Sequence, residues 1–172
     1  MGREVRRVPA DWEHPKDEQG NCIPMYARSY REAWAEWVEE RDQWHAGFVR
    51  SYKKTGPKWL PKSECKHAKN CQHFEDWNGT APNSRHHMPD WPDEERTHLM
   101  MYEDTSEGTP ISPAFETPEE LARWLADTGA SAFADMTATY EQWLAMIQRG
   151  WAPSAVAITG KPLQSGVEAL AD

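Results

Sequence analysis

The stretch spanning residues 96–126 constrains the fold more than any other, because it contains signals for a strand, a loop and a helix in direct succession. The short apolar run His98–Tyr102 is followed by turn residues and predicts a strand. Polar residues come next, and Gly108 among them permits a positive φ. Thr117 and Glu120 then form a capping box, which predicts the start of a helix. A strand, an ordered loop and a capped helix in this order commonly position a functional site.

Other segments carry similar signals. Arg3–Val8 alternates and ends before a proline, which predicts a strand, and capping boxes that begin at Ser29 and Thr139 predict two more helices. Ala155–Ile158 is a further candidate strand. We therefore expect an α+β fold, in which a small mixed or antiparallel sheet is packed by three helices.

Aromatic residues recur at helical spacing after Ser29. They follow one another at intervals of three, four and seven and form a stripe with Val38: Tyr30, Trp34, Trp37, Val38 and Trp44. Such a stripe is more often a core face than a ligand platform, so we expect it to pack inward.

The length of 172 residues favours a single domain over residues 1–172. Residues 52–92 contain five prolines and show no sustained periodicity. A stretch of this length without regular structure is uncommon in a compact domain, so we expect an irregular insertion or arm.

The net charge of −9 is unevenly distributed. Residues 101–172 contain 3 basic and 11 acidic side chains, whereas residues 48–70 contain 7 basic side chains and one acidic. This segregation indicates either internal attraction or separate surfaces for partners. Three cysteines, an odd number, argue against a disulfide framework, and neither a secretory signal nor a membrane span is evident. We expect a cytoplasmic protein without membrane association.

Two Cys-x-His pairs in residues 65–73 are the most metal-like cluster. Four nitrogen and sulfur ligands suit tetrahedral zinc, and the candidates are Cys65, His67, Cys71 and His73. The alternative is an exposed polar loop with incidental cysteine and histidine. Several lysines lie nearby in the sequence, and Tyr52, Trp59 and Phe74 lie between or beside them. Lysines can contact phosphates and aromatic rings can stack on bases, so a zinc-stabilised nucleic-acid-binding module is a further hypothesis. The acidity of the whole chain disfavours nucleic acid as the partner.

The acidic loop after the strand at residues 98–102 is the leading candidate for a binding site. No phosphate-binding loop, nucleophile elbow or dinucleotide fingerprint is present to specify a reaction. The candidate residues are Tyr102, Glu103, Asp104, Ser106, Glu107 and Thr109. A recognition surface, acid–base chemistry in a hydrolytic or ligand-binding enzyme, and a merely structural loop remain alternatives.

The sequences of four stretches resemble those of a known family: residues 6–15, 101–113, 116–127 and 150–155. In these stretches the chain resembles small proteins encoded in the genomes of tailed phages and prophages. The resemblance implies an origin and offers no catalytic residue. It leads us to expect a phage accessory protein that is not an enzyme and that binds a protein of the bacterial host, inhibition of a defence system being one form of this.

Overall fold

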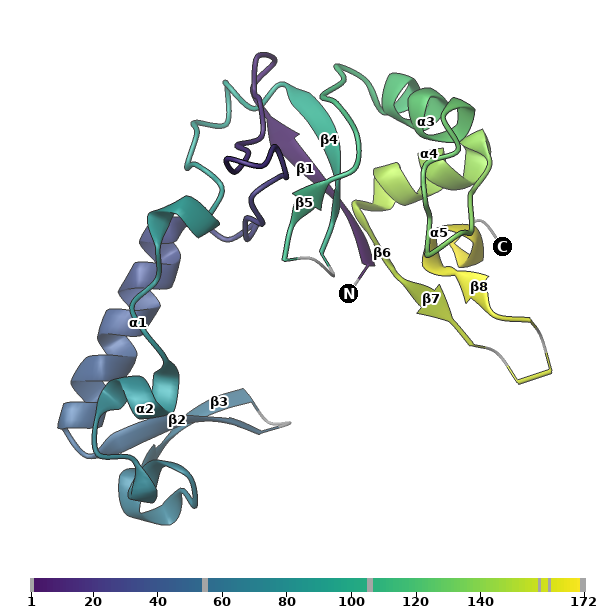
Figure 1. The fold of residues 1–172 in the computed structure, drawn as a ribbon. Helices are drawn as coiled ribbons and strands as arrows, with labels where there is room; N and C mark the ends of the chain where they lie inside the picture. Colours follow the sequence, from purple (N-terminus) through teal and green to yellow (C-terminus); the bar gives the residue numbers. More distant parts are fainter. Residues whose placement is uncertain (1, 54–55, 105–106, 158, 161, 171–172) are drawn as a thin grey trace. The chain divides into compact units, whose positions relative to one another are not determined.

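The computed structural model describes residues 2–53, 56–104, 107–157, 159–160 and 162–170, and it confirms an α+β fold (Figure 1). Contacts between residues divide the chain into two compact units. Unit 1 comprises residues 1–27 and 91–172, and unit 2 comprises residues 28–90. Unit 1 contains the main sheet.

That sheet has the strand order β5-β4-β1-β6, and each neighbouring pair is antiparallel. Its two central strands are the predicted ones, β1 (Gly2–Val8) and β4 (His98–Glu103), and Val5 lies opposite Met101. The outer strands are β5 (Thr109–Pro110) and β6 (Trp151–Pro153).

The prediction that Ala155–Ile158 forms a strand of this sheet is wrong. Ala155 and Val156 form β7, which pairs instead with β8 (Gln164–Ser165) in a separate two-stranded sheet, and Ile158 lies outside the described residues. The left-handed φ of 89° at Gly150 turns the chain beside β1, where the Val5 amide donates to the Gly150 carbonyl at 2.9 Å. The residues immediately after Gly150 therefore pair with β1 as β6.

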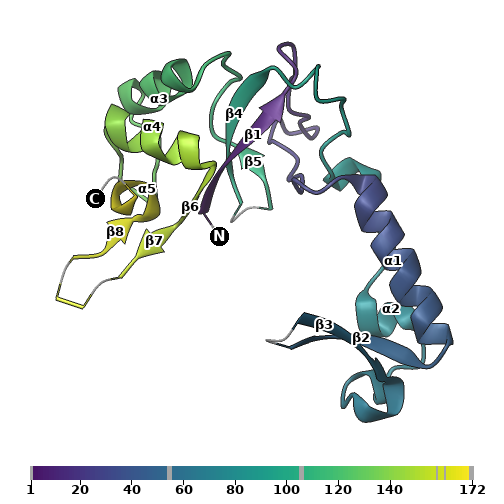
Figure 2. The same cartoon turned by 180° about the vertical axis from the view of Figure 1, so that it is seen from behind.

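The helices of unit 1 begin where their capping boxes predict. Helix α3 (Pro118–Asp127) is capped by Thr117, and α4 (Tyr140–Arg149) is capped by Thr139. A short helix, α5 (Gly166–Ala169), follows β8. Figure 2 shows α3 and α4 side by side, and these two helices make extensive mutual contacts.

Strand alternation gives the sheet two different faces. Leu99 and Met101 of β4 pack into an apolar cluster with residues of the helices: Leu121, Ala122, Leu125, Trp143, Met146, Ile147 and Val167. Met100 and Tyr102 alternate with them and point to the opposite face, where the segment before residue 26 lies. This second face is polar and holds the candidate site.

Unit 2 is built around α1 (Tyr30–His45), whose N-cap Ser29 accepts a hydrogen bond from the Glu32 amide at 3.3 Å. Strands β2 (Phe48–Lys53) and β3 (Gly56–Pro61) form a hairpin, and α2 (Phe74–Asn78) follows. The remaining part of the predicted irregular segment contains loops and three short 3₁₀ turns, at Lys62–Glu64, Ala68–Asn70 and Ser84–His86.

The aromatic stripe of α1 is only partly a core face. Trp44 is buried and packs with Val49 and Phe74, as predicted. Trp34 is 40% exposed and stacks on Trp37 at a centroid distance of 5.7 Å. The inward prediction is wrong for Trp34, because stacking on a neighbouring indole replaces burial there.

Candidate functional site

The predicted recognition loop begins inside the molecule. Tyr102 is the fifth residue of β4 and has an exposed fraction of 0%. It lies opposite Glu4 of β1, on the polar face of the sheet. Its side chain therefore belongs to the interior of unit 1 and is not available as a surface contact.

The carboxylates of the loop are engaged in contacts within unit 1. Glu103 forms an ion pair with the buried Arg3 at 3.2 Å, and Asp104 accepts hydrogen bonds from the Trp151 indole at 3.0 Å and from the Gly2 amide. Burial alone would raise the pKa of Asp104, but these two hydrogen bonds outweigh it and lower the pKa. Both side chains fasten the edge of the sheet.

The rest of the loop is similarly tied to its surroundings. Glu107 has a left-handed φ of 62° and accepts a hydrogen bond from Tyr26, which raises the pKa of that phenol. Thr109 pairs with Glu103 in the β4–β5 ladder. Ser106 lies outside the described residues. The structure thus gives each described residue of the loop a contact within unit 1.

A chain of hydrogen bonds centres on the Tyr102 hydroxyl. His14 Nε2 lies 2.7 Å from the Ile23 carbonyl, which only accepts, so we assign the ring hydrogen to Nε2. His14 Nδ1 then accepts from the Tyr102 hydroxyl at 3.2 Å, and that hydroxyl accepts from Trp12 Nε1 at 3.2 Å. The ring nitrogens of Trp12 and His14 and the hydroxyl of Tyr102 thus all have hydrogen-bond partners in this network.

Arg6 closes the network from the strand side. Its guanidinium carbon lies 4.3 Å from the centroid of the Tyr102 ring, within the range of a cation–π contact. The same guanidinium donates to Glu4 at 2.9 Å and to the Met25 carbonyl at 2.6 Å. Arg6 therefore joins β1 to the segment that covers the polar face.

A hollow of about 800 Å³ lies beside this network and is lined in part by Trp12, His14, Lys16 and Cys22. Burial lowers the pKa of His14 and raises the pKa of Tyr102, so both are neutral near pH 7. Because both ring nitrogens of His14 are already hydrogen-bonded, the ring has no free position for proton transfer to a ligand. The arrangement suits binding better than acid–base catalysis.

Sequence reasoning identified Tyr102 but missed Trp12 and His14 as its partners. These residues lie 90 and 88 positions away in the chain. The available signal was Trp12-x-His14 in a proline- and charge-rich loop, where two large ring side chains need a packing site.

The four predicted zinc ligands differ in their exposure to solvent. Cys65 and Cys71 are partly buried and pack against the cluster around Phe74, whereas His67 and His73 are exposed. Within the described residues, no group of three or more His, Cys, Asp or Glu side chains is placed to hold a metal ion. The structure therefore does not assemble the four residues into a zinc site.

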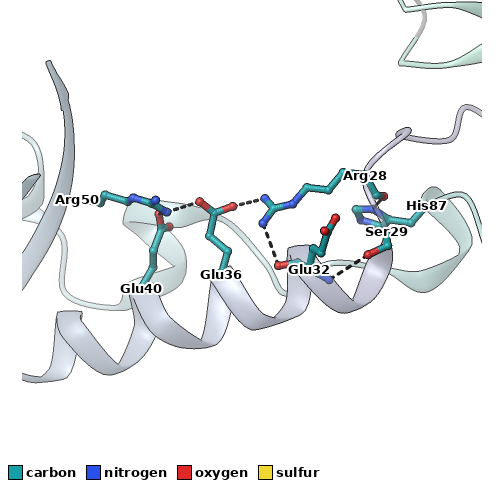
Figure 3. A network of polar contacts seen from close by, with 7 residues as sticks. All are labelled: Arg28, Ser29, Glu32, Glu36, Glu40, Arg50 and His87. Carbon is teal, nitrogen blue, oxygen red and sulfur yellow. Dashed lines mark hydrogen bonds and ion pairs between the residues drawn. The ribbon is translucent and has the colours of Figure 1, made fainter. Parts of the chain in front are cut away.

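A ladder of ion pairs runs along α1 in unit 2 (Figure 3). Glu36 lies between two guanidiniums, Arg28 from the segment before the helix and Arg50 from β2. Arg50 also approaches Glu40 at 3.4 Å. The hydrogen bond from Arg28, supported by the charges of Arg28 and Arg50, lowers the pKa of Glu36. The ladder fixes β2 against α1 and keeps Glu36 ionised.

A second hollow, of about 470 Å³, adjoins this ladder and is lined by residues that include Arg50, Lys66 and Trp77. Two cationic side chains near it have contacts within unit 2. Arg50 contacts two carboxylates, and Lys62 Nζ lies 3.4 Å from the centroid of the Trp44 ring. Glu36 and Glu40 therefore offset the charge of Arg50 beside this hollow.

A scan against protein-family models, a search of curated proteins and a search of solved structures each found no match to this chain. Among the residues that the structure describes, no helix has the length and apolar character needed to cross a membrane.

Proposed function

We propose that this chain is a binding protein without enzymatic activity, and that its acidic unit 1 engages a basic protein partner. The observation that carries the proposal is the segregation of charge between the two units. Unit 1 contains 8 Lys and Arg against 19 Asp and Glu, a net of −11, whereas unit 2 contains 11 against 9, a net of +2. Complementary potentials accelerate association and select partners of opposite charge.

The same segregation disfavours nucleic acid, because the acidic unit 1 would repel the phosphate backbone and unit 2 carries a net charge of only +2. His14 and Tyr102 form hydrogen bonds within unit 1, which supports a binding function over a catalytic one. The resemblance to proteins of tailed phages makes a protein of the bacterial host the partner we propose. Inhibition of a host defence system is the specific form that we favour.

The test is capture of partners by the full chain and by a charge variant in which four exposed carboxylates of unit 1 are replaced by amides. We expect the wild-type chain to retain a basic protein at a fixed ratio, and we expect the variant or raised salt to release it. Retention that is equal for both chains, or turnover of a metabolite by the purified chain, would contradict the proposal.

The hollow beside His14 favours a second candidate function, the binding of a small ligand. Here Trp12 is the reporter, because its indole lies at the wall of the hollow and bonds to Tyr102. When the chain is screened against a panel of small ligands, a ligand that binds should raise the melting temperature and change the indole fluorescence. If that ligand is anionic, Lys16→Gln should reduce both effects. Unchanged melting across the panel would eliminate this candidate.

A further inference from the structure

Another hollow in unit 1, of about 510 Å³, is formed by α3, the start of α4 and Phe115. Helices α3 and α4 pack against each other here, as Figure 2 shows. Three aromatic side chains contribute to its walls, namely Phe115, Trp124 and Tyr140, and each of them is partly exposed.

These rings are arranged to present their faces and edges to a guest. Phe115 and Trp124 lie 6.0 Å apart between centroids at an interplanar angle of 45°. The Arg123 guanidinium carbon lies 4.0 Å from the centroid of Tyr140. A guanidinium therefore already occupies one aromatic wall of this hollow, which identifies the kind of group that the walls accept.

The hollow is also negatively charged. Glu119, Arg123 and Asp127 follow one another at intervals of four along α3, so they lie on one face of the helix, and all three are exposed. Glu120 also lines the hollow, but one of its oxygens accepts the Thr117 amide at 3.1 Å in the capping box. Two exposed carboxylates, Glu119 and Asp127, thus line the hollow together with Trp124.

We propose that this hollow receives an arginine or lysine side chain from a basic segment of the protein partner. The cation lies against Trp124, and Glu119 and Asp127 balance its charge. This inference rests on the proposed function and names the part of unit 1 that reads the partner. An anionic guest would be repelled by the same carboxylates, and a purely apolar guest would desolvate them without compensation.

The experiment is a titration of the full chain with an arginine-rich peptide at low salt, followed by indole fluorescence and calorimetry. The probe has a neutral counterpart of nearly equal shape, in which citrulline replaces each arginine. We expect the arginine peptide to bind and the citrulline peptide to bind about tenfold more weakly, because citrulline loses both the cation–π contact and the charge that the carboxylates balance. A tenfold change in affinity corresponds to about 1.4 kcal/mol.

Two double variants separate the hollow from the general field of unit 1. Glu119→Gln with Asp127→Asn removes both carboxylates from the hollow, and Glu18→Gln with Asp135→Asn removes two exposed charges elsewhere in unit 1. We expect the first pair to weaken binding about fivefold to tenfold and the second pair less than about twofold, since exposed charges at a distance are screened.

Trp124→Leu tests the aromatic wall, and its melting temperature shows whether unit 1 still folds. We expect a folded Trp124→Leu variant to bind the arginine peptide about fivefold more weakly than the wild-type chain does. If both double variants weakened peptide binding equally, the hollow would not be the binding site, although the proposed function of unit 1 would still stand. Failure of the wild-type chain to bind the arginine peptide at low salt would overturn both.

Discussion

In unit 1 an apolar cluster joins the sheet to α3, α4 and α5, and a hydrogen-bond network lies on the opposite face of the sheet. In unit 2 the buried cluster among the described residues is formed by Trp44, Val49, Ala68 and Phe74. Outside that cluster, Trp34 stacks on Trp37, and Trp37 and Trp59 lie under the guanidiniums of Arg41 and Arg50. Helix α1 also carries the ion-pair ladder of Figure 3. Unit 2 thus adds surface ion pairs and cation–π contacts to a smaller buried cluster than that of unit 1.

The largest effect should follow from removing the central ring of the unit 2 cluster. Phe74 is buried and contacts the rings of Trp37 and Trp44 at centroid distances of 5.2 and 6.1 Å. We expect Phe74→Ala to reduce the stability of unit 2 by about 4 kcal/mol, because a small cluster cannot refill the cavity. Hydrogen exchange of the α1 amides measures this loss.

Phe74→Leu is the matched control, since it keeps most of the apolar volume and should cost about 1 kcal/mol. If the alanine variant were no less stable than the leucine variant, the cluster around Phe74 would not be what holds unit 2 together.

The next effect tests the packing of the polar face of unit 1. Gly108 has a φ of +99°, and a Cβ atom there would lie 2.0 Å from the Met25 carbonyl oxygen and 2.6 Å from an Arg6 nitrogen. We expect Gly108→Ala to cost about 3 kcal/mol, because backbone strain and a backbone clash add. Urea unfolding of the full chain provides the measurement.

Gly129→Ala controls for strain alone. Gly129 also has a positive φ, of +64°, but a Cβ atom there would have as its nearest neighbour a methyl group of Thr137 at 4.0 Å. Its expected cost is about 1 kcal/mol. Equal losses for the two variants would mean that the close approach of Met25 and Arg6 contributes nothing.

The hydroxyl of Tyr102 is the third target. Tyr102→Phe leaves the Trp12 indole and His14 Nδ1 without their partner, so we expect a loss of about 2 kcal/mol. Tyr140→Phe is the control, because Tyr140 holds Arg123 with its ring face. A loss for Tyr102→Phe no larger than for the control would remove the hydrogen-bond chain as a source of stability.

The same variant changes the pH dependence of unit 1. Burial lowers the pKa of His14 below 6.5, so the stability that depends on the neutral ring is present above pH 6.5 and is lost as the pH falls through the lower folded pKa. In Tyr102→Phe the ring no longer accepts the phenol hydrogen, so we expect its pKa to rise and this pH dependence to become shallower. An NMR titration of His14 follows the change directly.

These cases also show where sequence reasoning succeeds and fails. The helices α3 and α4 were predictable because Thr117 and Thr139 encode their starts within four residues. The strand that contains Tyr102 was predictable from local hydrophobicity. The partners of Tyr102 were not, because the hydrogen bond to His14 joins residues 88 positions apart and no local pattern specifies such a pairing.

The failures in strand order and in the aromatic stripe have related causes. β6 is only three residues long and ends in Pro153, so it lacks a strand signal and exists because Gly150 delivers it beside β1. Trp34 follows the helical period of a core face, yet nothing in the sequence states that unit 2 has too small a core to bury it. Burial depends on the size of the unit, which periodicity does not report.

The smallest expected effect concerns the ladder of unit 2. Hydrogen bonding to Arg28 and the charges of Arg28 and Arg50 lower the pKa of Glu36, so its contribution is present above its unfolded pKa of about 4.5 and is lost as the pH falls through the lower folded value. Glu36 is 27% exposed, so solvent screens the pairs and we expect Glu36→Gln to cost only about 1 kcal/mol at pH 7 and low salt. Glu39→Gln, at an exposed position of the same helix, removes the same charge and should cost less than about 0.3 kcal/mol. The difference between the two variants should shrink with added salt and disappear as the pH falls through the lowered pKa of Glu36, whereas the cost of Phe74→Ala should persist under both conditions. Equal costs for the two glutamine variants would mean that the ladder does not contribute to the stability of unit 2, and that the buried cluster around Phe74 stabilises this unit without it.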